Sequence, residues 1–329
     1  MTIGVVGAGS WGTALAVHLA RAGRTVRLWG REPEVVEGIR TRRRNPIYLS
    51  DVECPRGIEP TGRAEEAVHG VELIILVVPS EFFARTLKGL GRIPDGTPIV
   101  SATKGLDPER HVRMSELLDE KFPGAPMAVL SGPTFAREVA AGRPTASVVA
   151  ARDESLAARL QSALGTREFR LYTNRDVIGV ELGGALKNVI AIATGLADGL
   201  GLGENARAAL ITRGLAEITR LAVALGGQAR TLAGLAGLGD LVLTCTGSLS
   251  RNRSLGMALA QGQTQAAVER ETRMIAEGAR TVASALALAG QHGVSLPICA
   301  EVASVLFDGK RPAEALASLL SRSARPEED

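Results

Sequence analysis

The chain has 329 residues, 45% of them hydrophobic, which is enough to form two hydrophobic cores. Aromatic residues make up only 3% of the chain and the net charge is +3, so a nucleic-acid-binding surface is not expected. The three cysteines and four histidines are widely scattered, which indicates no disulfide framework and no metal site and is typical of a reduced, cytoplasmic protein.

The first predicted elements are a strand, a tight turn and a helix. Residues 2–23 begin with a β-branched run directly after the initial methionine, with no signal peptide, and then contain G-x-G-x-x-G. Gly7 permits the turn, Gly9 lets the backbone approach a pyrophosphate, and Gly12 allows close packing of the helix on the strand. A glycine pattern alone is weak evidence, but its position between a strand and a helix predicts a Rossmann-type dinucleotide-binding unit.

The second predicted strand begins at Thr25 and runs out at Arg31. A unit that binds NAD usually has an acid there to hold the ribose 2′-hydroxyl. The guanidinium of Arg31 favours the 2′-phosphate of NADPH instead, with NADH as the second choice. The alternative is that Arg31 is a solvated surface residue, and the adjacent Glu32 counts against a phosphate site.

Further strands are predicted to begin at Val71, Thr97, Met127 and Thr145, with helical stretches between them. This alternation predicts an α/β domain with a mainly parallel, doubly wound sheet. After Val177 the sequence is rich in Ala and Leu, and prolines and glycines mark the starts and ends of helices. We therefore expect a dinucleotide-binding domain over residues 1–176 and an all-α substrate and catalytic domain over residues 177–329.

Polar residues follow the predicted strands, where ligands bind in an open α/β sheet. Lys104 can reach an anion or a carbonyl group, and Gly132 and Thr134 can offer a backbone N–H and a hydroxyl. On position alone, Lys104 could equally be a surface lysine, and residues 132–134 could be an ordinary turn.

The segment 177–197 predicts a buried helix because it is apolar on every side. Its charged residues, Glu181 and Lys187, argue against a membrane span. A buried ammonium group is costly unless it is paired, and no acid lies one helical turn from Lys187. Lys187 is therefore either half of a structural ion pair or a catalytic acid/base with a lowered pKa.

A second polar group stands in the apolar segment 234–256. Asp240 is the candidate partner of Lys187. Arg251 has the fork geometry that binds phosphate, and Ser250 and Asn252 can add hydrogen bonds. Taken alone, the charges of residues 251–253 could belong to a solvated loop.

Seven ordered blocks are distributed over nearly the whole chain: GAGSWGTALA, VVPS, SATKGL, SGPTFA, ELGGALKNVIAIATG, GLGDLVLTCTGSLSRNR and MIAEGARTV. They resemble the NAD(P)-dependent glycerol-3-phosphate dehydrogenases of bacteria. The resemblance implies reversible reduction of dihydroxyacetone phosphate, a small phosphorylated substrate, to sn-glycerol 3-phosphate, the precursor of phospholipids. With the apolar content of the helical domain, it also leads us to expect a homodimer.

The resemblance implies a role for each matching residue, with Lys187 as the proton donor or acceptor. The cofactor contacts are the three glycines of the turn and the residues that the resemblance adds to them. Together they are Gly7, Gly9, Ser10, Trp11, Gly12, Arg31, Lys104, Ala136, Arg251, Glu277 and, more weakly, Ile275. The implied substrate contacts are Lys104, Gly132, Thr134, Lys187, Asp240, Ser250, Arg251 and Asn252. The family usually has Ser at Thr134, so the hydroxyl is kept, whereas residues 53–66 fit the family poorly and leave the local loop structure in doubt.

In the expected mechanism NADPH delivers hydride to the ketone carbon while Lys187 protonates the oxygen. Burial and the charge of Lys104 should lower the pKa of Lys187, and Asp240 should raise it.

Two alternatives stay open. One is a reductase of the 3-hydroxyacid dehydrogenase type, although that type has asparagine four residues after its lysine and this chain has Ala191. The other is a noncatalytic NADPH-binding regulator, which would have little need for Lys104, Lys187, Asp240 and Arg251 together.

Overall fold

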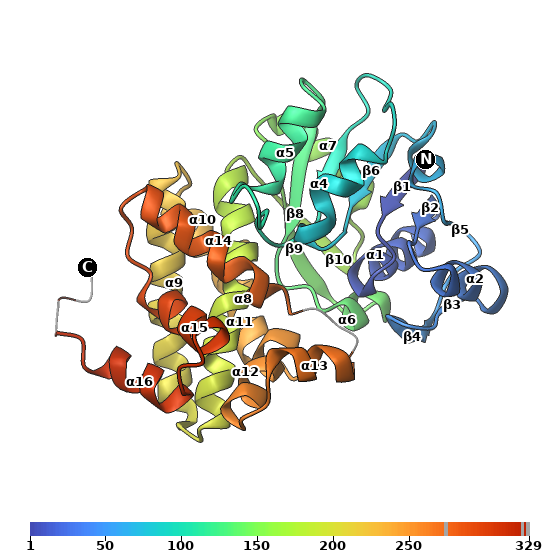
Figure 1. Cartoon of the computed structure of the whole chain (residues 1–329). Helices are drawn as coiled ribbons and strands as arrows, with labels where there is room; N and C mark the ends of the chain where they lie inside the picture. The colour runs from blue at the N-terminus through green and yellow to red at the C-terminus, as the bar shows by residue number, and fades with distance from the viewer. Residues whose placement is uncertain (273–275, 324–325, 327–329) are drawn as a thin grey trace.

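A computed structural model describes residues 1–272, 276–323 and 326. A strand-rich part, drawn in blue to green in Figure 1, adjoins a part made of helices, drawn in yellow to red. The last strand ends at Asn174, and after it the described residues form only helices and connecting segments. The fold class predicted from the sequence, a Rossmann-type domain followed by a helical domain, is confirmed.

The N-terminal domain contains one eight-stranded sheet with the order β10-β9-β8-β7-β6-β1-β2-β5. Its strands are β1 (Thr2–Val6), β2 (Thr25–Trp29), β5 (Ile58–Thr61), β6 (Leu73–Leu76), β7 (Ile99–Ser101), β8 (Met127–Ser131), β9 (Thr145–Ala150) and β10 (Phe169–Asn174). All neighbouring pairs from β5 across to β8 are parallel. The direction then reverses, because β9 is antiparallel to β8, and β10 runs parallel to β9. The sheet is thus mainly parallel, as expected.

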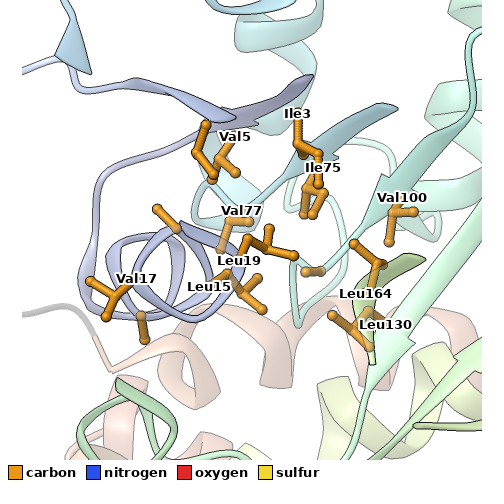
Figure 2. Packing of buried hydrophobic residues seen from close by; sticks show 14 of the residues in the cluster. Ile3, Val5, Leu15, Val17, Leu19, Ile75, Val77, Val100, Leu130 and Leu164 are labelled. Atoms are coloured by element: carbon orange, nitrogen blue, oxygen red, sulfur yellow. The ribbon is translucent and has the colours of Figure 1, made fainter. Parts of the chain in front are cut away.

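Side chains alternate between the two faces of the sheet, so each face carries its own layer of helices. On one face Ile3, Val5 and Ile75 pack with Leu15 and Leu19 of α1, as Figure 2 shows. The opposite face packs against α3, α4 and α5. The helices of the N-terminal domain are α1 (Ser10–Arg21), α2 (Pro33–Arg42), α3 (Ala64–Val68), α4 (Ser80–Lys88), α5 (Met114–Lys121), α6 (Ala136–Ala140) and α7 (Glu154–Leu164).

Two edge regions were not predicted from the sequence. A small hairpin, β3 (Arg44–Asn45) and β4 (Leu49–Glu53), precedes β5, which pairs with β2 at the sheet edge. Pro60 lies within β5, and an edge strand tolerates proline because one side of it needs no ladder hydrogen bonds. At the other edge, β10 alternates buried Phe169 and Leu171 with exposed polar residues.

The C-terminal domain is built around α8 (Val177–Gly199), most of whose residues are buried. The other elements are α9 (Gly203–Ala224), α10 (Ala229–Leu232), the π-helix η1 (Leu235–Gly239), α11 (Asp240–Thr246), α12 (Arg251–Ala260), α13 (Gln265–Thr272), α14 (Glu277–Gln291), α15 (Pro297–Phe307) and α16 (Pro312–Leu320). Pro297 and Pro312 begin α15 and α16, which confirms that prolines mark helix starts in this part of the chain.

Helix α8 is long and apolar enough to cross a membrane by length and composition alone, but 94% of its most apolar window is buried inside the protein. Its first turns lie against the sheet, where Val180 packs with Val129 and Val148. Further along, Gly184 faces the Ser131 hydroxyl at the end of β8. The helix therefore runs along the sheet toward the side at which the parallel strands have their C-terminal ends.

Candidate active site

The glycine turn after β1 has the geometry expected of a phosphate-binding turn. Gly7 has a φ of 122°, which favours glycine, and a Cβ on Gly12 would lie 1.8 Å from the Gly7 carbonyl oxygen. Gly9 caps α1, and a Cβ there would meet nothing within 4 Å. The turn and the close packing are confirmed, and the open space at Gly9 fits a pyrophosphate at the helix N-terminus.

The other predicted cofactor contacts of this domain lie on several elements. Ser10 donates a hydrogen bond from its hydroxyl to the Tyr48 carbonyl (2.9 Å). Trp11 has a buried indole nitrogen without a hydrogen-bond partner among the described residues. Arg31, after β2, forms an ion pair with Glu32 (2.8 Å), and Ala136 is the first residue of α6.

Lys187 meets two acceptors that lie on α11. Its Nζ atom forms an ion pair with the Asp240 Oδ1 atom and donates a hydrogen bond to the Thr244 hydroxyl (2.9 Å). All three side chains are buried. The partner that the sequence suggested for Lys187 is therefore confirmed.

Lys104 joins the same carboxylate from the other domain. Its Nζ atom lies 2.7 Å from Asp240 Oδ2, and it also donates to the Gly132 carbonyl (2.9 Å) and to the Thr134 hydroxyl (3.3 Å). We call the group of Lys104, Lys187 and Asp240 the lysine cluster. Gly132 was expected to offer its N–H to a ligand, whereas here its carbonyl orients Lys104.

The lysine cluster changes the acid strength of Lys187. Burial lowers the pKa of Lys187 from 10.5 to about 8, with Asp240 opposing that change and Lys104 adding to it. These are the directions expected from the sequence. A lysine with a pKa of about 8 can both donate and accept a proton near neutral pH.

The N-terminus of α12 presents the predicted phosphate-binding residues. Ser250 caps the helix by accepting a hydrogen bond from the Arg253 N–H, and Arg251 is the exposed first residue. Asn252 is buried between the two neighbouring helices, donating to the Asn188 side chain (3.0 Å) and accepting from the Gly278 N–H (2.9 Å). The loop alternative for residues 251–253 is wrong, because they open a helix.

Glu277 begins α14, and the next residue, Gly278, donates to Asn252 at the start of α12. Burial raises the pKa of its carboxyl, and the positive charges of Arg251, Lys104 and Lys187 act against that rise. The remaining candidate, Ile275, lies outside the described residues.

Two surface hollows lie away from these residues. One of about 510 Å³ adjoins β5 and α3, and one of about 420 Å³ adjoins β9 and η1. Neither hollow is lined by a residue of the lysine cluster. We therefore place the candidate site from the contacts of its side chains and from their positions after the strands.

Comparison with known proteins agrees with this geometry. Residues 2–157 match the family model for the NAD-dependent glycerol-3-phosphate dehydrogenase N-terminus, and residues 176–317 match that for its C-terminus. The chain belongs to the NAD-dependent glycerol-3-phosphate dehydrogenase family. It is 49% identical over 332 residues to glycerol-3-phosphate dehydrogenase [NAD(P)+] of Koribacter versatilis, covering 99% of this chain and 98% of that one.

Other members of the dehydrogenase family are similar over most of their length. The Rhodospirillum rubrum glycerol-3-phosphate dehydrogenase [NAD(P)+] is 50% identical over 326 residues, which cover 99% of this chain and 93% of that one. The crystal structure of glycerol-3-phosphate dehydrogenase from Coxiella burnetii superposes with a TM-score of 0.94 at 42% identity, covering 98% of this chain and 99% of that one.

Two members of this candidate site, Asn188 and Thr244, were not predicted from the sequence. Thr244 lies four residues after Asp240, so both share one face of α11, and this spacing could have revealed it. Asn188 directly follows Lys187, but its link to Asn252 depends on how α8 and α12 pack together.

Proposed function

We propose that this chain catalyses the reversible reduction of dihydroxyacetone phosphate to sn-glycerol 3-phosphate, with NADPH as the preferred cofactor and NADH as the second. The observation that carries the proposal is the lysine cluster, in which Asp240 holds two ammonium groups at the junction of the two domains. Membership of the dehydrogenase family supports the same reaction.

The bound nicotinamide supplies hydride to the ketone carbon. Lys187 gives its proton to the carbonyl oxygen during reduction and takes a proton from the hydroxyl during oxidation. Lys104 adds a second positive charge, which stabilises the negative charge that develops on that oxygen. Asp240 is buried and fixes the positions of both amines.

The substrate phosphate is assigned to the α12 N-terminus. Arg251 is exposed there, and the backbone N–H groups of the first helical turn favour an anion. Asn252 and Ser250 support this end of the helix. Binding energy from the phosphate thereby positions the carbonyl group next to Lys187.

The family membership and the fold also support three broader proposals. We assign residues 1–176 to the cofactor domain and residues 177–329 to the substrate and catalytic domain, since the strands end at Asn174 and α8 begins at Val177. The enzyme is proposed to act in the cytoplasm, where lipid precursors are made. A homodimer is proposed because the helical domain is apolar.

The test is an assay that follows NADPH absorbance with dihydroxyacetone phosphate as substrate and 3-oxoacids as controls. Rapid oxidation of NADPH with the phosphorylated ketone alone is the expected result. Turnover of the 3-oxoacids instead would identify the other reductase type, and binding of NADPH without turnover of either substrate would identify a regulator.

A further inference from the structure

Two guanidinium groups share one aromatic ring near the glycine turn. The Arg31 guanidinium carbon lies 5.2 Å from the centre of the Phe82 ring, and that of Arg85 lies 5.0 Å from the same centre. The two cations are therefore within about 10 Å of each other, since neither is farther than 5.2 Å from the ring centre. Both residues are exposed, so both can meet a ligand.

This pair lies beside the adenosine end of a dinucleotide site. The Gly7 N–H donates to the Trp29 carbonyl at the end of β2, and a Cβ on Gly7 would lie 2.4 Å from the Val77 carbonyl oxygen after β6. The ends of β2 and β6 thus flank the glycine turn. Arg31 follows β2, and α4, which carries Arg85, follows β6. The ribose next to adenine is bound after the second strand in such units.

The two cations differ in their surroundings. Arg31 donates to the Glu32 carboxylate from both Nη2 (2.8 Å) and Nε (3.2 Å), and Tyr48 donates to the same oxygen (3.3 Å). Glu32 therefore offsets the charge of Arg31. Arg85 rests on the Phe82 ring and projects from α4 toward solvent.

We propose that Arg85 is a second phosphate-binding cation, and that Glu32 acts against it, so that the two residues set the preference between NADPH and NADH. The 2′-phosphate of NADPH carries close to two negative charges at neutral pH, which one partly neutralised arginine balances poorly. The ribose 2′-hydroxyl of NADH can instead donate a hydrogen bond to Glu32. This inference rests on the proposed function, because it assigns specificity within the same cofactor site.

The first test compares kcat/KM with NADPH and with NADH. Arg85→Gln should lower the NADPH-to-NADH ratio by about tenfold, the size expected for loss of a hydrogen bond between charged groups. Glu32→Gln should raise the NADPH-to-NADH ratio. Arg85→Lys keeps the positive charge, so it should keep most of the ratio of the unaltered protein. Arg170→Gln is the matched control, because Arg170 lies 5.2 Å from the Tyr172 ring on the distant strand β10, and it should leave the ratio unchanged.

A second test needs no turnover, so it separates this inference from the proposed reaction. Calorimetry should show that Arg85→Gln weakens binding of 2′,5′-ADP by about tenfold and leaves binding of 5′-ADP unchanged. An equal effect on both nucleotides, or no effect on either, overturns the assignment of Arg85. A fall in the NADPH-to-NADH ratio for Glu32→Gln overturns the assignment of Glu32.

Discussion

At the scale of single residues, the acid strength of Lys187 depends on its burial and on two charged neighbours with opposing effects. Burial lowers its pKa, Lys104 lowers it further, and Asp240 raises it, which leaves a value of about 8. A lysine exposed to solvent would titrate well above neutral pH. Burial, together with the charges of Asp240 and Lys104, therefore makes this amine useful for proton transfer in both directions.

Replacing Lys187 tests its proposed role directly. Lys187→Met should lower kcat by a factor on the order of 10² to 10⁴, because the proton donor is lost while the apolar volume is kept. NADPH binding, followed by fluorescence titration, should stay the same. Lys310→Met is the matched control, because Lys310 also pairs with a carboxylate, that of Glu301 (2.6 Å), but is not part of the lysine cluster. This control should leave kcat unchanged. A near-normal kcat for Lys187→Met would remove this residue from the mechanism.

The pH profile should follow the Lys187 pKa. Reduction needs the charged amine, so kcat/KM for dihydroxyacetone phosphate should fall as the pH rises through about 8. Oxidation needs the neutral amine, so kcat/KM for sn-glycerol 3-phosphate should rise over the same pH interval. Because Asp240 raises this pKa, Asp240→Asn should move the midpoint of the profile to lower pH. A midpoint that moves upward in this variant contradicts the charge assignment.

Residue-level prediction from the sequence worked where burial forced a partner. A buried ammonium needs an acid, and Asp240 was a lone acid in an apolar segment, so the pair could be predicted without a structure. The contacts of Gly132 and Asn252 could not be predicted. They depend on a positive φ of 151° at Gly132 and on the approach of α12 to α8, which no local spacing encodes.

At the scale of elements, α8 and α12 pack closely because glycines line their contact. A Cβ on Gly195 would lie 2.1 Å from the Arg253 carbonyl oxygen, and one on Gly256 would lie 2.2 Å from the Ile192 carbonyl oxygen. Asp198 at the end of α8 adds an ion pair with Arg253 (2.6 Å). These contacts fix the position of the helix that we assign to the substrate phosphate.

Adding one methyl group at this contact should disturb both stability and binding. Gly195→Ala should lower the free energy of unfolding by about 1 to 3 kcal/mol, because backbone atoms must move, and should raise the KM for dihydroxyacetone phosphate. Gly290→Ala in α14, where a Cβ meets nothing within 4 Å, should instead stabilise the protein by about 0.5 to 1 kcal/mol. Urea denaturation measures both, and equal changes would contradict the packing argument.

Element prediction was most accurate for long, strongly patterned segments. The buried helix of residues 177–197 and the strands next to the glycine turn follow from composition and periodicity alone. The edge strands β5 and β10 were missed because about half of their residues are polar. Their pairing is decided by the neighbouring strand and not by their own residues.

At the scale of the whole molecule, a buried polar contact joins the two domains away from the lysine cluster. Glu181 of α8 accepts hydrogen bonds from the Arg113 guanidinium (2.9 Å), the Ser115 N–H (2.9 Å) and the Ser115 hydroxyl (2.6 Å). Burial raises the pKa of this carboxyl, although Arg113 acts in the opposite direction. The contact fixes α8 against the start of α5.

Removing one partner of this contact should be costly. Glu181→Ala should lower the free energy of unfolding by about 1 to 3 kcal/mol, because the Ser115 N–H and hydroxyl lose their buried acceptor and Arg113 keeps only its ion pair with the more exposed Glu116 (3.2 Å). Glu120→Ala, which removes the exposed pair of Glu120 with Arg110, should cost at most about 1 kcal/mol. Thermal unfolding compares the two variants, and similar small losses would show that the contact between domains adds little.

The reversed direction of β9 and β10 determines where α8 starts. The chain leaves β10 beside the middle of β8, because Asn174 pairs with Ala150 and Ala150 pairs with Val129, so the helix must extend past the end of β8 before its amine reaches Asp240. Ten residues from Val177 to Lys187 rise about 15 Å. The first half of α8 is therefore a spacer of fixed length. Losing one residue from it would turn the amine by about 100° away from its carboxylate.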